Sequence, residues 1–187
     1  MEATAVLRDL PGTGPVDAGT CWDATPELTA AMRFRRVLGH FPTGVALITA
    51  MTPDGPAGMA VNSFTSVSLE PPLVLFCAAN GSSTWPRIRK AGAFAVNILG
   101  EDDVEVCRQF AQKGADRFAG SGYRLGTTGA PVLGGMAAHL DCHLDAVHDA
   151  GDHVIVLGRV VHLEADEGVR PLVFHGGGYC ALQPCAS

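Results

Sequence analysis

The chain alternates between short hydrophobic runs and clusters of turn-forming residues, and most of these runs have the length and composition of β-strands. The run VALITAM, which begins at Val45, is followed by the turn signal TPDGP and then by AGMAVNSFTSVS, which begins at Ala57. These two runs predict an antiparallel hairpin. Further strands are predicted at residues 73–78 and 93–99.

A second hairpin is predicted in the last third of the chain. Its strands cover residues 138–147 and 153–164, and the segment HDAGD between them supplies the Gly and Asp that a tight turn needs. Many short strands, separated more often by turns than by helices, favour an antiparallel barrel over a parallel α/β sheet. The predicted fold is therefore mainly β with peripheral helices, in a closed or nearly closed antiparallel barrel.

Helical patterns are confined to three segments. The first is predicted from a cap at Thr25, with Pro26 in the first turn, to about Gly39. The second has the sequence SSTWPRIRKAG, and the third has the sequence EDDVEVCRQFAQK, whose leading carboxylates suit the positive end of a helix dipole. The apolar face of the first helix comprises Leu28, Met32, Phe34, Val37 and Leu38.

The 187 residues are enough for one domain with a sizeable core. Residues 1–24 mix Gly, Pro, Thr and Asp without a sustained period, so they are predicted to form a flexible N-terminal arm. The folded domain is predicted to cover residues 25–187.

Composition narrows the function classes. Hydrophobic residues make up 47% of the chain and charged residues only 17%, so part of the apolar surface is expected to cover a subunit interface in a homo-oligomer. A formal charge of −6 and scattered basic residues argue against a nucleic-acid partner. No apolar run has the length of a membrane span and no signal peptide is apparent, so a cytoplasmic protein is expected. The six dispersed cysteines are expected to be reduced.

Several familiar catalytic motifs have weak counterparts or none. The string GSGYRLG has one residue too many for a dinucleotide-binding fingerprint and no strand before it. The histidines between His139 and His153 raise the possibility of a zinc or iron site. However, strand alternation places His139 and His143 on one face and Cys142 on the other, which predicts a solvated polar face without a metal. The glycine run HGGGY is open to two interpretations, a close approach to a ligand or a plain turn.

An unusual polar stretch, AVNSFTSVS, directly precedes the apolar run that begins at Pro71. Asn62 and Ser63, and likewise Thr65 and Ser66, are adjacent pairs and fall on both faces of a regular strand. Some of these side chains must therefore point inward or belong to an irregular segment. Inward polar groups need hydrogen-bond partners, and a ligand can supply them.

A second polar patch follows the strand predicted at residues 73–78. Asn80, Ser82, Ser83 and Thr84 lie at the start of the second predicted helix, where free backbone N–H groups favour an anion such as phosphate. Ordinary N-capping by Ser82 or Ser83 would explain one hydroxyl group but leaves the others without a role.

Six blocks, in order, resemble the short-chain flavin reductase family: FPTGVALITA, GMAVNSFTSVSLEPPLVLF, SSTWPRIRKAGAFAVNIL, FAQKGADRF, GAPVLGG and GDHVIVLGRV. The resemblance extends from about Phe34 to Leu182. It implies an FMN-binding split barrel and an NAD(P)H:flavin oxidoreductase, with FMN or FAD as the flavin and NADH or NADPH as the reductant. It also implies a homodimer that hands reduced flavin to a separate flavin-dependent monooxygenase.

The resemblance also implies roles for particular residues. His153 would lie near the nicotinamide and orient it, as the one catalytic candidate; a turn-ending His bonded to backbone is the alternative. No metal is implied. Residues implied to bind the flavin ring and ribityl chain, or to support the turn beside them, are Thr43, Gly44, Asn62, Ser63, Phe64, Thr65, Ser66 and Ser68. Ser82, Ser83 and Thr84 are implied to help bind the ribityl phosphate, and Lys113 or Arg117 to add positive charge near it. Ala79 and Phe110 are also implied to bind the cofactor.

Two other functions are compatible with the same residues. A non-catalytic flavin-binding or haem-binding carrier or sensor would keep the same barrel. A structural zinc protein would instead use the histidines between His139 and His153. In a flavin reductase, hydride passes directly between stacked rings and needs no acid–base pair. The lack of a recognisable acid–base pair therefore does not discriminate among the three hypotheses.

Overall fold

The computed structural model describes residues 28–112 and 116–182, and within them it contains three helices and twelve strands. The helices are α1 (Ala30–Leu38), α2 (Trp85–Ala91) and α3 (Val104–Ala111). The strands are β1 (Thr43–Gly44), β2 (Ala46–Thr52), β3 (Gly55–Val61), β4 (Thr65–Leu69), β5 (Pro72–Ala79), β6 (Ala93–Ile98), β7 (Tyr123–Leu125), β8 (Pro131–Leu133), β9 (Ala138–Ala150), β10 (His153–Ala165), β11 (Leu172–His175) and β12 (Gly178–Ala181).

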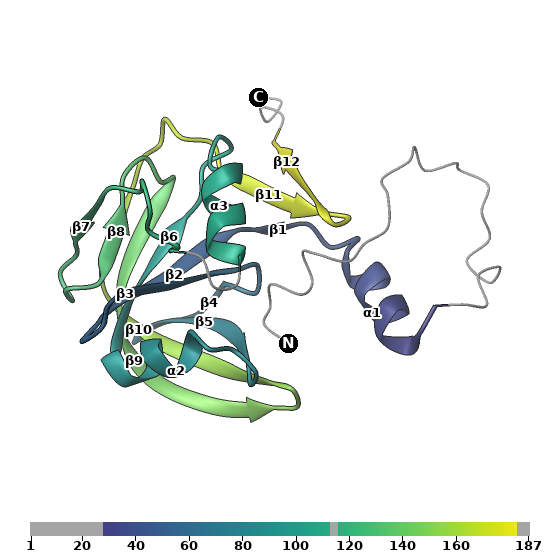
Figure 1. The fold of residues 1–187 in the computed structure, drawn as a ribbon, viewed down its shortest axis with the longest axis horizontal. Helices are drawn as coiled ribbons and strands as arrows, with labels where there is room; N and C mark the ends of the chain where they lie inside the picture. Colours follow the sequence, from purple (N-terminus) through teal and green to yellow (C-terminus); the bar gives the residue numbers. More distant parts are fainter. Residues whose placement is uncertain (1–27, 113–115, 183–187) are drawn as a thin grey trace.

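Seven of these strands form one antiparallel sheet in the order β3-β2-β6-β9-β10-β5-β4. Its two edge strands, β3 and β4, are consecutive in the chain, so the sheet curls round and brings its edges together (Figure 1). The predicted hairpins are confirmed as β2–β3 and β9–β10. The mainly β barrel with peripheral helices is confirmed as well.

Aromatic side chains fill the interior of the curled sheet. The rings of Phe76 and Phe94 meet edge to face with centroids 5.4 Å apart, and Trp85 of α2 packs on Phe76 at 6.0 Å. Trp85 and Ile88 are both buried, so α2 covers the sheet beside β2. At Gly158, a Cβ would lie 2.4 Å from the Phe94 ring, and only glycine allows this close approach.

The segment predicted as one long strand from Ala57 to Ser68 is two strands. β3 ends at Val61, residues 62–64 turn away, and β4 leaves to pair with β5 rather than with β2. The register of β4 then shifts between Ser66 and Ser68. The break follows from barrel closure, because the chain has to change partners where the sheet edges meet.

Helix α1 begins later than predicted. Thr29 is its N-cap, and its hydroxyl accepts a hydrogen bond from the Met32 backbone N–H at 3.3 Å. Thr25 and Pro26 lie outside the described residues, as does the whole of the predicted arm at 1–24. No residue of α1 is buried: Phe34 is 68% and Val37 61% exposed, so residues 28–112 and 116–182 do not cover the predicted apolar face.

Three local expectations are corrected or settled. The leading carboxylates of EDDVEVCRQFAQK precede α3 instead of forming its first turn, and Glu101 pairs with Arg170 at 2.7 Å. The polar face of β9 is not solvated throughout, since His139 and Asp141 are buried. The run HGGGY is the tight turn of the β11–β12 hairpin, where two glycines take positive φ values. None of the described helices is long and apolar enough to span a membrane.

Candidate functional site

The barrel is closed by a short seam where β3 approaches β5. Ser63, just after the end of β3, links the two sides of this seam. The hydroxyl of Ser63 accepts a hydrogen bond from the Cys77 backbone N–H on β5 at 2.9 Å. Asn62, Ser63 and Phe64 are all half-buried at this point. The predicted irregular segment is therefore confirmed, and one of its inward hydroxyl groups is satisfied by the protein itself.

The hydroxyl groups that follow point outward. Thr65 and Ser66 of β4 are exposed, and Ser68 is half-buried beside the shift in register. These residues form the outer edge of the sheet, so their side chains are accessible to a ligand or to a second protein chain.

Thr43 and Gly44 lie at the same end of the barrel. Ala46 of β2 faces Val61 of β3, so the residues just before Ala46 and the residues just after Val61 leave the sheet together. The Thr43 hydroxyl oxygen is buried without a hydrogen-bond partner. Such an atom is costly, and a ligand donor or water would offset the cost.

A cleft lies further along the same seam, where β3 faces the start of α2; we call it the β3–α2 cleft. Its volume is about 300 Å³. Three of the predicted phosphate residues, Ser83, Thr84 and Arg117, line it together. The complete lining is Pro56, Ala57, Gly58, Ser83, Thr84, Arg87, Asp116, Arg117 and Phe118.

Arg117 is held in a defined position in this cleft. Its Nη1 donates to the Gly58 carbonyl and to the Thr84 hydroxyl, both at 2.6 Å, and its Nε donates to the Gln112 carbonyl at 3.2 Å. A guanidinium fixed in this way is suited to an anion because its charge and orientation are set before binding. Arg87 adds a second guanidinium to the cleft wall.

Phe110 lies beneath the cleft, not in its lining. The residue is fully buried and its ring packs on Phe118 with centroids 4.9 Å apart. A Cβ on Gly58 would lie 2.5 Å from the Phe110 ring, so the strand rests directly on it. Phe110 thus packs under Gly58 in this structure, and its contact with the flavin stays a prediction.

Ser82 and Ala79 also face the protein interior. The Ser82 hydroxyl accepts hydrogen bonds from the backbone N–H groups of Thr84 at 3.2 Å and Trp85 at 3.1 Å. This matches the capping role that the sequence offered as an alternative to phosphate binding. Ala79 is fully buried at the end of β5. Lys113 lies outside the described residues.

His153 begins β10 beside the end of β5, where it is the register partner of Ala79. Its side chain is 29% exposed, and its Nδ1 lies 2.7 Å from the Asp152 carboxylate, not from a backbone group. The hydrogen bond with His153 is the main cause that lowers the pKa of Asp152 below its usual range. Asn80 ties the β9–β10 turn to β5, because its side-chain amide donates to the Gly151 carbonyl at 3.1 Å.

Two charged residues of the cleft, Arg87 and Asp116, were not predicted from the sequence. Arg87 stands three residues after Thr84, about one helical turn along α2, so helical spacing could have placed both on one wall. No comparable signal marks Asp116, because the approach of the 116–118 turn to β3 is purely tertiary.

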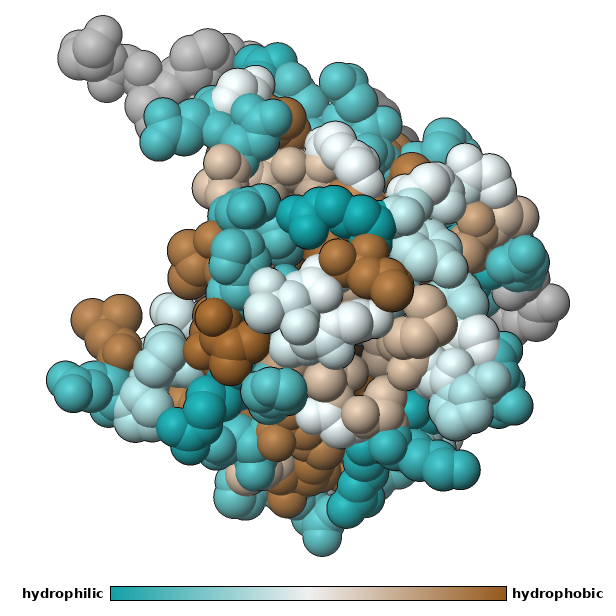
Figure 2. Space-filling model, turned by 90° about the vertical axis from the view of Figure 1, so that its left-hand side faces the viewer, coloured by the Kyte–Doolittle hydropathy of each residue, from teal (hydrophilic) through white to brown (hydrophobic). Residues whose placement is uncertain are grey.

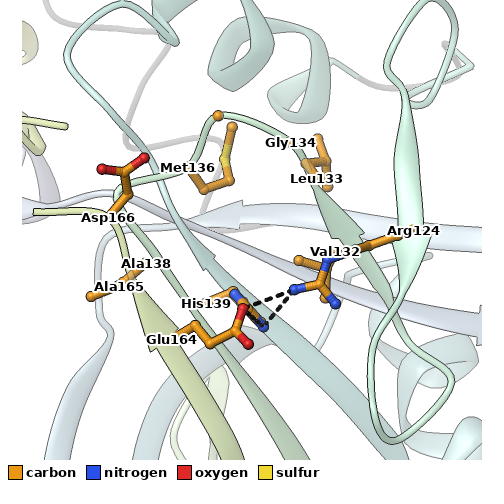
Figure 3. Close-up of a pocket in the computed structure, with 11 residues that line it drawn as sticks. Arg124, Val132, Leu133, Gly134, Met136, Ala138, His139, Glu164, Ala165 and Asp166 are labelled. Atoms are coloured by element: carbon orange, nitrogen blue, oxygen red, sulfur yellow. Dashed lines mark hydrogen bonds and ion pairs between the residues drawn. The ribbon is translucent and has the colours of Figure 1, made fainter. Parts of the chain in front are cut away.

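A second cavity of about 220 Å³, which we call the Arg124 pocket, opens between β7, β9 and β10 (Figure 3). Arg124, His139 and Glu164 converge there, while Met136 and Asp166 lie further along its wall. Burial, followed by the nearby Arg124 charge, lowers the pKa of His139.

The histidines between His139 and His153, which the sequence raised as a possible zinc or iron site, do not come together. His139 is buried, whereas His143 and His148 are exposed further along the long strand β9, and His153 lies beyond the turn. Extended backbone spaces such residues too widely to share one ion.

This curled seven-stranded barrel, with a polar seam and a cationic cleft at one side, defines a split barrel of the flavin-binding class. A family model described as the flavin reductase like domain matches residues 38–183. The chain belongs to this family, so the resemblance found in the sequence is confirmed.

The chain is 50% identical over 147 residues to a flavin reductase from Pseudomonas putida, covering 78% of this chain and 86% of that protein. It is 45% identical over 178 residues to the reductase subunit HsaB of a flavin-dependent monooxygenase from Rhodococcus jostii, covering 95% and 87%. Among solved structures, the chain is similar to the NADH:FAD oxidoreductase SgcE6 of Streptomyces globisporus in complex with NAD and FAD fragments.

For that SgcE6 complex the TM-score is 0.81 at 37% identity, covering 84% of this chain and 96% of that chain. The predicted class of enzyme is thereby confirmed: the chain is a flavin reductase, an NAD(P)H-dependent oxidoreductase.

Proposed function

We propose that a flavin lies along the barrel seam, with its ring system against residues 62–66 and its phosphate in the β3–α2 cleft. The observation that carries this placement is the convergence of Ser83, Thr84, Arg87 and Arg117 on one cavity. Two guanidinium groups and two hydroxyl groups form a donor set suited to phosphate oxygens.

The spacing along β3 supports the placement. Gly58 lines the cleft and Asn62 begins the polar segment four residues later, which corresponds to about 13 Å of extended strand. The ribityl chain would bridge this interval beside the seam. The buried Thr43 hydroxyl at the same end of the barrel would supply a donor that the ring's acceptor atoms can use.

In this arrangement the protein acts mainly by orientation. A bound flavin supplies the electron-accepting ring, to which the nicotinamide delivers a hydride. Residues 62–66 would hold one ring, and the half-buried His153, fixed by Asp152, would contact the nicotinamide. Close, stacked positioning of two bound rings is the main catalytic contribution that these residues offer.

NADH is the proposed reductant, and a flavin-dependent monooxygenase is the proposed recipient of the reduced flavin. The NADH:FAD oxidoreductase SgcE6 and HsaB, the reductase subunit of a flavin-dependent monooxygenase, are the similar proteins that support these two assignments. FMN and FAD both fit the proposal, since both carry the ribityl phosphate that the cleft would bind. A cytoplasmic location remains a prediction.

A homodimer is also part of the proposal. Phe34 and Val37 of α1 and Phe41 just after it present apolar side chains to solvent in the single chain, and Phe41 is 72% exposed. An apolar helix face of this kind is typical of a surface covered by a second copy. No nucleic acid is expected to take part.

Oxidation of NADH and NADPH, with and without added FMN, FAD or riboflavin, tests the proposed function. Turnover that depends on added flavin is the expected result, together with transfer of reduced flavin to a monooxygenase in a coupled assay. Tight co-purification of a flavin without any NAD(P)H oxidation would instead favour the carrier or sensor.

A further inference from the structure

Two residues that line the Arg124 pocket, His139 and Glu164, lie close to His162 of β10, and none of the three belongs to the proposed flavin site. We propose that His139, His162 and Glu164 form a binding site for a divalent transition-metal ion such as Zn²⁺. The ion would take the place of the Arg124 guanidinium between His139 and Glu164.

Strand register brings the three side chains together. His139 of β9 and Glu164 of β10 are direct register partners in the antiparallel pair. His162 stands two residues before Glu164, so alternation puts both on the same face of β10. All three ligands therefore come from two paired strands, which are rigid supports for a metal site.

The distances suit a small ion. The His139 Nε2 lies 3.8 Å from a Glu164 oxygen, and the His162 Nε2 lies 3.2 Å from the other oxygen of that carboxylate. All the ligand atoms lie within 4.8 Å of one another. A tetrahedral zinc ion with bonds of about 2.0–2.2 Å holds its ligand atoms roughly 3.3–3.5 Å apart.

Burial gives the site one fixed ligand and two adjustable ones. The His139 side chain is only 8% exposed, whereas those of His162 and Glu164 are 38% and 59% exposed. The two exposed side chains can close the remaining gap without moving the backbone. Two imidazoles and one carboxylate favour zinc and its neighbours over magnesium or calcium, which prefer oxygen ligands.

A cation already lies where the ion would bind. Arg124 Nη2 is 3.2 Å from the His139 Nε2 and 3.1 Å from a Glu164 oxygen, as Figure 3 shows. Because an arginine can only donate, the His139 Nε2 presents its lone pair to the pocket, and a metal would use the same lone pair. The Arg124 side chain is 55% exposed, so it can swing into solvent when an ion displaces it.

Metal binding would have a local structural effect. The ion would cross-link β9 and β10 through side chains, and the displaced Arg124 would release β7 from its contact with β10. We expect stabilisation of the barrel that increases with the concentration of free metal, because the ion binds the folded chain and not the unfolded one.

The test is titration of the full, untagged chain, treated with a chelator, with Zn²⁺ in a calorimeter and with Co²⁺ in an absorption spectrometer. We expect one ion per chain, a Co²⁺ spectrum without a sulfur charge-transfer band, and a rise in the unfolding temperature on adding Zn²⁺. His139→Ala, His162→Ala and Glu164→Gln should each weaken binding by about 10-fold or more.

Two further variants complete the design. His143→Ala, an exposed histidine on the same strand β9, should leave the affinity unchanged. Arg124→Ala should raise the affinity several-fold, because the competing cation is removed. Since His162 and Glu164 are exposed, their variants remain informative even if His139→Ala fails to fold.

Three outcomes would overturn the proposal. They are no binding by the unmodified chain, binding that survives loss of His162 and Glu164, and a sulfur charge-transfer band showing that cysteines hold the ion. An affinity that Arg124→Ala leaves unchanged would refute the exchange between the arginine and the metal.

Discussion

Replacement of Arg117 by Ala tests the proposed phosphate end of the flavin site. Arg117 is oriented by the Gly58 carbonyl and the Thr84 hydroxyl, each at 2.6 Å, inside the β3–α2 cleft. A bound phosphate would gain a charge-assisted hydrogen bond from this guanidinium, worth about 1.5–3 kcal/mol. Loss of the side chain should therefore raise the KM for FMN roughly 10- to 150-fold.

Riboflavin provides the internal control because it has the same ring and no phosphate. Its KM should change little in Arg117→Ala, so the ratio of the two KM values isolates the phosphate contact. Arg117→Lys keeps the positive charge but loses the planar guanidinium. Its KM for FMN should therefore lie between those of the wild type and Arg117→Ala. Arg159 is an exposed arginine of β10 that pairs with Asp145 of β9. Its replacement in Arg159→Ala should leave both KM values unchanged.

Steady-state NADH oxidation at varied FMN and riboflavin concentrations measures these effects. Thermal unfolding of each variant shows whether the loss of the Gly58 and Thr84 contacts has altered the fold. If the KM values for FMN and riboflavin rise by the same factor, Arg117 does not bind phosphate and the placement of the flavin is wrong.

Three other predictions follow from the fold. Asn97→Leu should lower the free energy of unfolding by about 2–3 kcal/mol in urea titrations, because the fully buried amide donates to Thr49 and accepts from the Leu133 backbone N–H; an unchanged midpoint would contradict this. Burial raises the pKa of Cys142 from 9.0 to about 12. The stability that the protonated thiol contributes is therefore complete below pH 9 and is lost by up to about 1.4 kcal/mol per pH unit as the pH rises towards 12. The free energy of unfolding, measured against pH, should lack this part of the alkaline decrease in Cys142→Ala. Phe34→Glu should shift the chain towards monomer in light scattering, and a wild-type chain that is already monomeric would refute the dimer.

Periodicity and turn chemistry were sufficient for most of the strands and for both hairpins, because these features depend on neighbouring residues. The turn between β9 and β10 was predictable from Gly and Asp, and the two strands paired as expected. The break after Val61 was not predictable from periodicity alone. It depends on which strands meet when the sheet closes, and that is a property of the whole barrel.

The candidate site divides in the same way. Ser83, Thr84 and Arg117 were predicted from the family resemblance, and they meet in one cleft. Ser82 and Phe110 were predicted with them, yet the first caps α2 and the second lies under Gly58. Sequence position identifies a side chain near a site, but its direction is set by the packing around it.

The sequence by itself determined the family, the strand content and the chemical character of the proposed flavin site, because composition, alternation and motif order are all properties of the linear chain. Only the tertiary structure decided which groups converge. Arg87 and Asp116 joined the cleft, and His139 met His162 and Glu164 across a strand pair, while its sequence neighbours His143 and His148 pointed elsewhere. The physical reason is that side-chain convergence depends on register and closure between distant strands, which local preferences do not encode.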